Sequence, residues 1–381
     1  MKWEKNQLVN KTSYLKRGIS PKYVEGVGHI IINQKCIRDN RIDFTFSKIC
    51  DSQKTIPEEK ILKKGDILIN STGKGTLGRT AQIKNDLEET LLVDTHITIV
   101  RAAEDVDQFF LGQLIRKNEI VIEAMGKGST QQLELSRTDL GELELSFPPL
   151  PTQRKIASIL SAYDDLIENN LKRIKLLEAK AFVSYKLLDK VEKSNLTELY
   201  DTSSGGTPSR TNAEYFTGEI NWFKSKELAD SILLESEEKI TEQAIDKSSA
   251  KLFPTGSVII AMYGATIGKL GLLSQPSTTN QACCAIIQKD EIKSNYYILN
   301  WLIENKEYVL SFRMGAAQEN ISQQVIRNLL VSIPKDNDLK FFNQEMKPIY
   351  QLIKNLIQQN TKLREARDIL LPKLMNGQIE V

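Results

Sequence analysis

One stretch of the chain reads Gly65-Asp-Ile-Leu-Ile-Asn-Ser-Thr-Gly-Lys-Gly-Thr-Leu-Gly-Arg79, and it returns in altered form as Gly256-Ser-Val-Ile-Ile-Ala-Met-Tyr-Gly-Ala-Thr-Ile-Gly-Lys269. Each version is an apolar run, then a glycine-rich turn, then a basic residue. Two further pairs follow in the same order: Met125-Gly126 with Met314-Gly315, and Leu145-Ser-Phe-Pro148 with Val331-Ser-Ile-Pro334. Several matches in one order, about half the chain apart, are typical of an internal repeat. The sequence therefore predicts a tandem duplication.

Each half ends in a segment with the pattern of a long helix. Apolar residues recur there at alternating spacings of four and three, which is typical of a coiled-coil seam. The predicted seam consists of Ile156, Leu160, Tyr163, Ile167, Asn170, Ile174 and Leu177 in the first helix, and of Met346, Ile349, Ile353, Leu356, Asn360 and Leu363 in the second. Asn170 and Asn360 occupy matching places, where a polar residue costs stability but sets register and partner. The alternative is that each helix packs only on its own domain, although such regular seams favour a helical partner.

The rest of each half contains short β-type runs separated by turns. The clearest runs are Ile30–Ile32, Ile67–Ile69, Ile97–Val100 and Val258–Ile260. We expect an α+β fold with a domain at residues 1–149, a helix within 150–193, a second domain at 194–335 and a second helix within 336–381.

Composition excludes some classes of protein and leaves others open. The 381 residues are 40% hydrophobic and 26% charged, which is ordinary for a globular protein. No apolar run is long enough to span a membrane, and the start lacks the pattern of a secretory signal. Neither the four cysteines nor His29 and His96 show metal-ligand spacing, so we expect no metal site. We expect the cysteines to be incidental buried thiols of a reduced, cytoplasmic protein. The net charge of +2 neither demands nor excludes a nucleic-acid partner.

Three motifs resemble the specificity subunit of type I restriction–modification systems. The opening of that family's target-recognition domain is similar to Ser203-Ser-Gly-Gly-Thr-Pro-Ser209, followed by Glu214-Tyr-Phe-Thr-Gly218 and Asn221-Trp-Phe-Lys-Ser-Lys226. Its central conserved helix begins in a way similar to Pro148-Pro-Leu-Pro-Thr-Gln153, and its C-terminal ending resembles Leu371-Pro-Lys-Leu-Met-Asn-Gly-Gln378. Two places depart from the family pattern. The first domain opens with Arg17-Gly-Ile-Ser-Pro-Lys-Tyr23, and the second helix is entered through Ile333-Pro-Lys-Asp-Asn-Asp338.

The resemblance implies two α/β target-recognition domains, in inverted orientation, separated by two long antiparallel coiled-coil helices. It implies that the different domain openings read different halves of a bipartite, asymmetric site in double-stranded DNA. It further implies that two methyltransferase subunits dock on the helices and that a restriction–translocase subunit joins the full complex. S-adenosylmethionine, ATP and Mg²⁺ are then expected on those partners. An alternative from another class is a non-catalytic, protein-binding adaptor of a defence system.

The first glycine-rich turn raises the question of nucleotide binding. Gly73-Lys-Gly-Thr-Leu-Gly-Arg-Thr80 nearly matches a phosphate loop, but Arg79 replaces the lysine and the residues that follow do not promise a helix. A turn that faces DNA phosphate is favoured, and a purely structural turn is left open. We found neither a dinucleotide fingerprint nor an amino-methylation motif, so no catalytic centre is expected on this chain.

DNA contacts require donors and acceptors at base edges and cations at phosphates. Loop residues of these types are the candidates, with solvated surface charge as the alternative for each. In the first domain they are Asn33, Gln34, Lys35, Arg38, Lys74, Arg79, Lys127, Ser129, Gln131 and Gln132. In the second domain they are Arg210, Lys224, Lys226, Tyr263, Lys269, Arg313 and Gln318.

Overall fold

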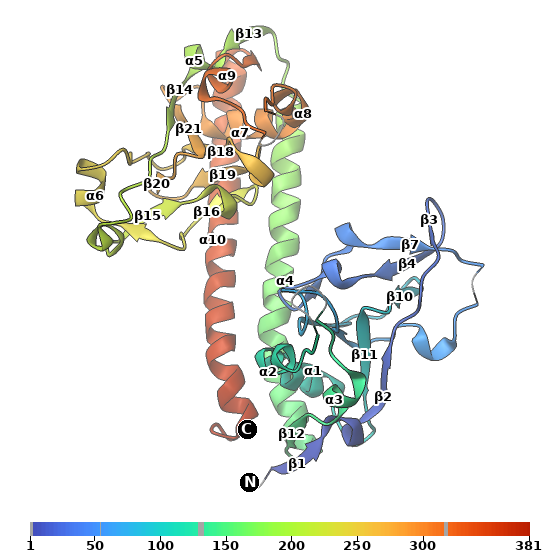
Figure 1. The fold of residues 1–381 in the computed structure, drawn as a ribbon. Helices are drawn as coiled ribbons and strands as arrows, with labels where there is room; N and C mark the ends of the chain where they lie inside the picture. The colour runs from blue at the N-terminus through green and yellow to red at the C-terminus, as the bar shows by residue number, and fades with distance from the viewer. Residues whose placement is uncertain (1–2, 54, 129–132, 316–318) are drawn as a thin grey trace. The chain divides into compact units, whose positions relative to one another are not determined.

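The computed structural model describes residues 3–381 apart from 54, 129–132 and 316–318, and the chain divides into two compact units. Unit 1 comprises residues 1–167 with 362–381, and unit 2 comprises residues 168–361. The two long helices, α4 (Leu150–Lys186) and α10 (Asp336–Met375), each contribute one part to each unit (Figure 1). No helix in the described part of the chain is both long and apolar enough to cross a membrane.

Unit 1 is built on an antiparallel sheet in the order β2-β11-β8-β9. Its strands are β2 (Thr12–Arg17), β11 (Ile97–Ala102), β8 (Ile67–Asn70) and β9 (Thr80–Gln82). A second sheet, in the order β10-β4-β7-β3, contains β10 (Leu91–Val93), β4 (His29–Ile32), β7 (Lys48–Cys50) and β3 (Tyr23–Val24). Two smaller pairs join β1 (Glu4–Gln7) with β12 (Glu144–Phe147), and β5 (Ile37–Arg38) with β6 (Arg41–Ile42). The predicted β-type runs of this half therefore lie in β4, β8 and β11.

Unit 2 repeats this plan. Its main sheet has the order β14-β21-β18-β19-β16. The strands are β14 (Tyr200–Ser204), β21 (Cys283–Gln288), β18 (Val258–Ala261), β19 (Leu270–Leu273) and β16 (Ser231–Leu233). The second sheet contains β17 (Lys239–Ile240), β15 (Ile220–Phe223) and β20 (Thr278–Thr279), and β13 (Glu192–Asn195) pairs with β22 (Leu330–Ile333).

Strand pairing shows that the duplication predicted from sequence is structural. In unit 1 the central strand β11 pairs antiparallel with β2 and β8, and in unit 2 β21 pairs in the same way with β14 and β18. A parallel pair in the second sheet also recurs, β4 with β10 in unit 1 and β15 with β20 in unit 2. Unit 2 differs because β16 extends its main sheet next to β19.

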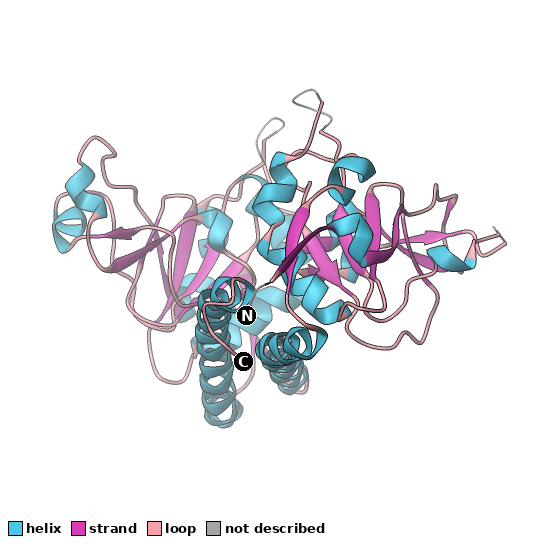
Figure 2. Cartoon of the chain, turned by 90° about the horizontal axis from the view of Figure 1, so that it is seen from below, coloured by secondary structure: helices cyan, strands magenta, loops and turns pink. Residues whose placement is uncertain are grey.

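Short helices complete each unit, so that strands and helices are mixed in both (Figure 2). Unit 1 has α1 (Gln108–Lys117), α2 (Glu119–Ala124) and α3 (Arg137–Gly141). Unit 2 has α5 (Leu196–Leu199), α6 (Glu242–Asp246), α7 (Asn295–Glu304), α8 (Lys306–Leu310) and α9 (Gln323–Arg327). Polar caps explain why α1 and α7 begin where they do: the Asp107 carboxylate accepts from Phe109 N at 3.0 Å, and Ser294 Oγ accepts from Tyr297 N.

The two long helices pack against each other in both units. In unit 1, Ile156 and Leu160 of α4 share a core with Leu371 and Leu374 of α10. In unit 2, Ile174, Ala181 and Tyr185 of α4 share a core with Leu356, Met346 and Phe342 of α10. The numbers rise along one helix as they fall along the other, so the pairing is antiparallel. The predicted seam residues are all buried except Tyr163, Leu177 and Leu363, which are half-buried.

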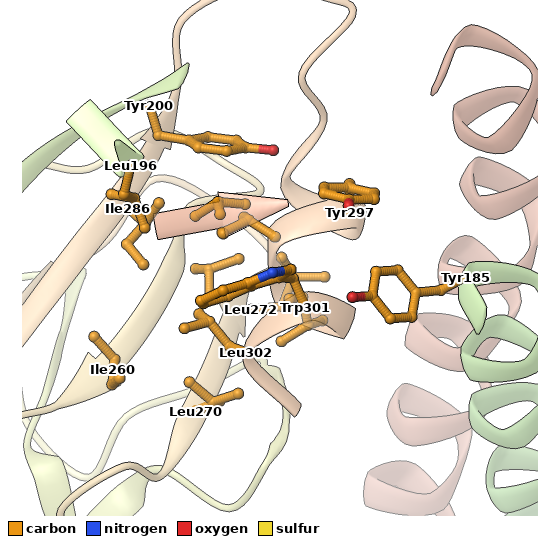
Figure 3. Close-up of a cluster of buried hydrophobic side chains, with 14 of the residues drawn as sticks. Tyr185, Leu196, Tyr200, Ile260, Leu270, Leu272, Ile286, Tyr297, Trp301 and Leu302 are labelled. Carbon is orange, nitrogen blue, oxygen red and sulfur yellow. The ribbon is translucent and has the colours of Figure 1, made fainter. Parts of the chain in front are cut away.

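The seam also packs on the domains. Trp301 and Tyr297 of α7 lie between the sheet residues Leu270 and Leu272 and Tyr185 of α4 (Figure 3). The rings of Tyr185 and Tyr297 are 5.4 Å apart, and Tyr185 Oη donates to Glu304 at 2.6 Å. Each helix therefore has both a helical partner and its own domain as a packing surface.

The polar contact between a domain helix and a long helix differs between the two units. In unit 1, the Asp164 carboxylate accepts from Gln113 of α1 at 2.9 Å and from Arg367 of α10 at 2.7 Å. In unit 2 a neutral pair holds the corresponding place, where Asn300 of α7 donates to Tyr350 Oη at 2.9 Å. Tyr350 also borders an apolar cavity of about 350 Å³. The duplication thus keeps a polar link between the domain helix and the long helix while its chemistry changes from ionic to neutral.

Candidate nucleic-acid interface

The loops at one edge of each main sheet carry most of the predicted DNA contacts. Loop cluster 1, in unit 1, comprises residues 33–36, 71–79, 94–96 and the described parts of 125–135. Loop cluster 2, in unit 2, comprises residues 205–208, 224–227, 262–269, 280–282 and the described parts of 312–321. In unit 1, segment 71–79 follows β8 and segment 94–96 precedes β11, and these two strands are paired. In unit 2, segment 262–269 follows β18 and segment 280–282 precedes β21, which are paired in the same way, so each cluster stands on a hydrogen-bonded strand pair.

Backbone hydrogen bonds show that the clusters share one framework. In cluster 1, Ser71 N donates to His96 O at 2.8 Å, and Leu135 N donates to Ser71 O at 2.8 Å. In cluster 2, Met262 N donates to Ala282 O at 2.8 Å, and Ile321 N donates to Met262 O at 2.9 Å. Equivalent backbone positions therefore present different side chains in the two units.

The domain openings, which differ in sequence, also share this framework. Gly18 N donates to Ile97 O, as Gly205 N donates to Cys283 O, both at 3.0 Å. A Cβ atom at Gly18 would lie 2.1 Å from Val93 O, and one at Gly205 would lie 2.4 Å from Asn280 O. A side chain fits at neither glycine, so Gly18-Ile-Ser-Pro21 is the structural counterpart of Gly205-Gly-Thr-Pro208. The sequence analysis identified the first opening as a departure from the family pattern, and the structure shows that the two openings share one backbone geometry.

The glycine-rich turns lead into strands. The first turn is followed by β9, with positive φ angles at Gly73, Gly75 and Gly78 of 96°, 71° and 84°. The second turn contains the 3-10 helix η7 (Gly264–Thr266) and leads into β19. A nucleotide-binding phosphate loop is followed by a helix, whereas strands follow both of these turns. This geometry agrees with the β-turn interpretation and not with a phosphate loop.

Hydrogen bonds tie the loops of cluster 1 together. Thr72 Oγ1 lies 3.0 Å from Gln34 Oε1 and 2.8 Å from His96 Nδ1. Arg17, which was not among the predicted DNA contacts, donates to Thr95 O, Leu135 O and the Glu134 carboxylate at 3.0, 2.8 and 3.1 Å. Burial lowers the pKa of Arg17 from its ordinary value, although Glu134 acts in the opposite direction. Arg17 therefore holds two of the loops in place.

The predicted contacts of unit 1 fall into distinct environments. Lys35, Arg38, Lys74 and Arg79 are exposed, and none of them forms an ion pair within the described residues. Arg38 lies in strand β5, not in a loop, and its guanidinium stacks 4.5 Å from the Phe46 ring centre. Lys127 is exposed and pairs with Asp139 at 2.8 Å. Exposed cations of this kind are suited to DNA phosphates.

Asn33 does not fit the prediction of an exposed loop donor. It is only 8% exposed and caps the 3-10 helix η2 (Gln34–Cys36). Its Oδ1 accepts from Lys35 N at 2.9 Å and its Nδ2 donates to Phe46 O at 2.6 Å. Both polar atoms are used within the turn, so Asn33 supports the loop and is not available to a base. Gln34 is half-buried against Thr72.

In unit 2 the predicted cations are paired with acidic residues. Lys224 and Lys226 contact Glu237 at 3.2 and 2.6 Å, and their hydrogen bonds, that of Lys226 first, lower the pKa of this carboxyl. The remaining pairs are Arg210 with Glu238 at 2.7 Å, Lys269 with Asp230 at 2.8 Å, and Arg313 with Glu319 at 2.9 Å. Arg210 also stacks on Phe216 and Trp222. Such exposed pairs are weak and exchange readily for phosphate.

Four candidates lie outside the described residues: Ser129, Gln131, Gln132 and Gln318. Tyr263 is 39% exposed, and Met314, which was not among the predicted DNA contacts, is 68% exposed. Within the part of the chain that the structure describes, no three His, Cys, Asp or Glu side chains are grouped to hold a metal ion. All four cysteines are buried and free, and burial raises the pKa of Cys283 and Cys284 to about 12.

Comparison with known proteins places both units in one family. The model of the type I restriction modification DNA specificity domain matches residues 16–179 and again residues 189–371. The chain is 26% identical over 350 residues to the type I restriction enzyme MjaIX specificity subunit of Methanocaldococcus jannaschii, covering 84% of this chain and 79% of that one. It is 22% identical over 407 residues to the HindI specificity subunit of Haemophilus influenzae, covering 84% and 88%.

A solved structure shows the same fold. The crystal structure of a type I restriction–modification S subunit from M. genitalium aligns over 98% of this chain and 96% of that one, with a TM-score of 0.59 and 14% identity. Two family matches in tandem, on two units of the same topology, leave one conclusion. The chain belongs to the type I restriction–modification DNA specificity family and is a specificity subunit that recognises DNA sequence.

Proposed function

We propose that the chain reads a bipartite, asymmetric DNA site, one half with each loop cluster, and that it contributes recognition and docking while its partners carry the chemistry. The carrying observation is that one backbone framework appears twice with different side chains at equivalent positions. A shared framework presents side chains to DNA in the same way in both units, and sequence is read by the side chains that reach base edges. Different side chains then select different half-sites.

The long helices support a fixed spacing between the half-sites. With 37 and 40 residues, α4 and α10 have lengths of about 55 and 60 Å at 1.5 Å per residue. The buried hydrogen bond from Asn170 Nδ2 to Asn360 Oδ1, 3.0 Å long, favours one register of the pair. A helix pair of fixed register is a suitable ruler for an unread spacer.

The outer faces of the helices support docking of two copies of one partner. Leu166 of α4 and Leu352 of α10 occupy equivalent positions and are exposed. Val183 of α4 and Ile369 of α10 form a second equivalent, exposed pair. Each unit thus has one member of each equivalent pair, and unit 2 exposes Leu176 and Phe341 on the same helices as well. Exposed apolar groups that recur in this way mark interaction sites. Two methyltransferase subunits would occupy them, with S-adenosylmethionine bound by those subunits and ATP with Mg²⁺ by a restriction–translocase subunit.

The test is to purify the chain with the methyltransferase subunit with which it assembles and to sequence the DNA that the complex methylates. Replacing residues 200–330 with the matching segment of another family member should change one half of the methylated motif and leave the other half intact. A motif that changed in both halves, or a complex that methylated without sequence preference, would contradict the proposal. A protein-binding adaptor would form a complex that shows no motif at all.

A further inference from the structure

Three residues at the centre of each loop cluster stand side by side. In unit 1, Glu134 forms antiparallel bridges with both Thr72 and Lys127. In unit 2, Asn320 forms the same two bridges with Tyr263 and Met314. We call Thr72, Glu134 and Lys127 row 1, and Tyr263, Asn320 and Met314 row 2. Directly opposed residues of an antiparallel pair point to the same face, about 5 Å apart, so each row presents three neighbouring side chains.

Row 2 combines an amide with two apolar groups. Tyr263 and Met314 are 39% and 68% exposed, and Asn320 is half-buried between them. Within the described residues, none of these three side chains forms a hydrogen bond with another side chain. Large apolar side chains at the tip of a polar loop cluster gain stability only when a partner covers them.

Row 1 has the opposite character. Lys127 pairs with Asp139 at 2.8 Å, and Glu134 pairs with Arg17 at 3.1 Å. The side chains of Lys127 and Glu134 are 75% and 68% exposed, whereas their partners Asp139 and Arg17 are 24% and 20% exposed. Lys127 and Glu134 therefore keep most of their surface free for a further partner while their ion pairs hold them in place. Row 1 therefore offers one cation and one carboxylate side by side.

The geometry points to a difference in the bases read: row 2 contacts an A·T pair in its half-site, and row 1 contacts a G·C pair. This inference rests on the proposed function, because it assumes that the loop clusters face DNA. Asparagine matches the N6 and N7 atoms of adenine, and an apolar group fits the thymine methyl on the same pair. Lysine matches O6 and N7 of guanine, and a carboxylate accepts from N4 of cytosine.

Row 2 would read its base pair from the major groove. The thymine methyl, which row 2 would cover, lies only in the major groove.

The experiment uses the complex with its methyltransferase, after the motif has been sequenced and each half assigned to a unit by the segment replacement above. Each thymine in the unit 2 half-site is replaced by deoxyuridine, which removes only the methyl group, and each adenine by 7-deazaadenine, which removes N7. We expect one deoxyuridine to weaken binding about fourfold, the factor for one buried apolar carbon. One 7-deazaadenine at the same pair should weaken it at least about fivefold. In the unit 1 half-site, 7-deazaguanine should have the corresponding effect.

Variants connect these effects to row 2. In Met314→Ser the deoxyuridine effect should disappear, and in Asn320→Ala the 7-deazaadenine effect should disappear. Val191→Ser is the matched control, because Val191 is an exposed apolar residue of unit 2 outside the loop cluster. It should keep both effects unchanged. The modified bases test the unaltered complex as well, so the result does not depend on how the variants fold.

Two results would overturn the inference while leaving the proposed function intact. One is a unit 2 half-site that contains no A·T pair, and the other is full affinity for every deoxyuridine and 7-deazaadenine in that half. Sensitivity to 7-deazaadenine with none to deoxyuridine would also overturn the role of Met314 and Tyr263. A motif that does not divide between the units would instead refute the proposed function.

Discussion

The ionic cluster around Asp164 should make unit 1 far more sensitive to one substitution than unit 2. Asp164 lies 2.7 Å from Arg367, 3.4 Å from Arg116 and 3.3 Å from Lys84, and its side chain is 9% exposed. Burial by itself would raise the pKa of Asp164, but the three cations outweigh it and lower the pKa to about 2. A shift from 3.8 to about 2 corresponds to about 2.5 kcal/mol of stability at neutral pH.

The perturbation is Asp164→Asn, which keeps the shape and removes the charge. It leaves three cations without their central partner, and breaking a buried pair in this way costs about 3–5 kcal/mol. The two arguments together predict a loss of about 3 kcal/mol in the free energy of unfolding at pH 7. Tyr350→Phe is the control at the equivalent place in unit 2, where one neutral hydrogen bond from Asn300 is lost. It should cost only about 1 kcal/mol.

Urea unfolding measures both losses, and amide hydrogen exchange assigns each loss to its unit. The pH dependence has a definite direction. The folded pKa of Asp164 is below the unfolded value, so its contribution is complete above about pH 5 and is lost as the pH falls towards 2. The difference between the wild type and Asp164→Asn should therefore shrink on acidification. Equal losses for Asp164→Asn and Tyr350→Phe at pH 7 would refute the reasoning.

Three other outcomes are expected. Asn170→Leu should lower stability by about 1–3 kcal/mol because it removes the buried hydrogen bond that Asn170 Nδ2 donates to Asn360 Oδ1. The double variant with Asn360→Leu should regain that loss in thermal unfolding. A seven-residue insertion after Leu177, matched by one after Leu363, should lengthen each helix by about 10.5 Å. The spacer in the methylated motif should then grow by about three base pairs. Insertion of two residues at each of the same places should instead abolish assembly. An active seven-residue double insertion with the original spacer would show that the helices are not the ruler. The chain alone should bind DNA weakly in about 150 mM salt, because its near-neutral net charge provides little attraction to the phosphates. Addition of the methyltransferase should tighten binding, as measured by fluorescence anisotropy. Tight, specific binding by the chain alone would count against this prediction.

Local periodicity was enough to determine the main elements. The seams containing Asn170 and Asn360 indicated two long helices, and the apolar runs at Ile67–Ile69 and Val258–Ile260 indicated buried strands. These signals are readable because a helix or a strand repeats its environment every few residues. The duplication was also visible, since several short motifs recur in one order. The motifs around Gly205 and Pro148 carried the family assignment.

Tertiary structure decided which side chains are available and which are already engaged. The sequence marked Asn33 and Lys269 alike as loop candidates, yet Asn33 is buried as a cap and Lys269 is paired with Asp230. The bridges to one asparagine bring Tyr263 beside Met314, although the two residues lie about fifty positions apart in the sequence. No local pattern encodes such contacts, because they depend on how strands and loops from distant parts of the chain meet. Sequence alone therefore determined the elements and their repetition, and folding determined the surfaces on which recognition depends.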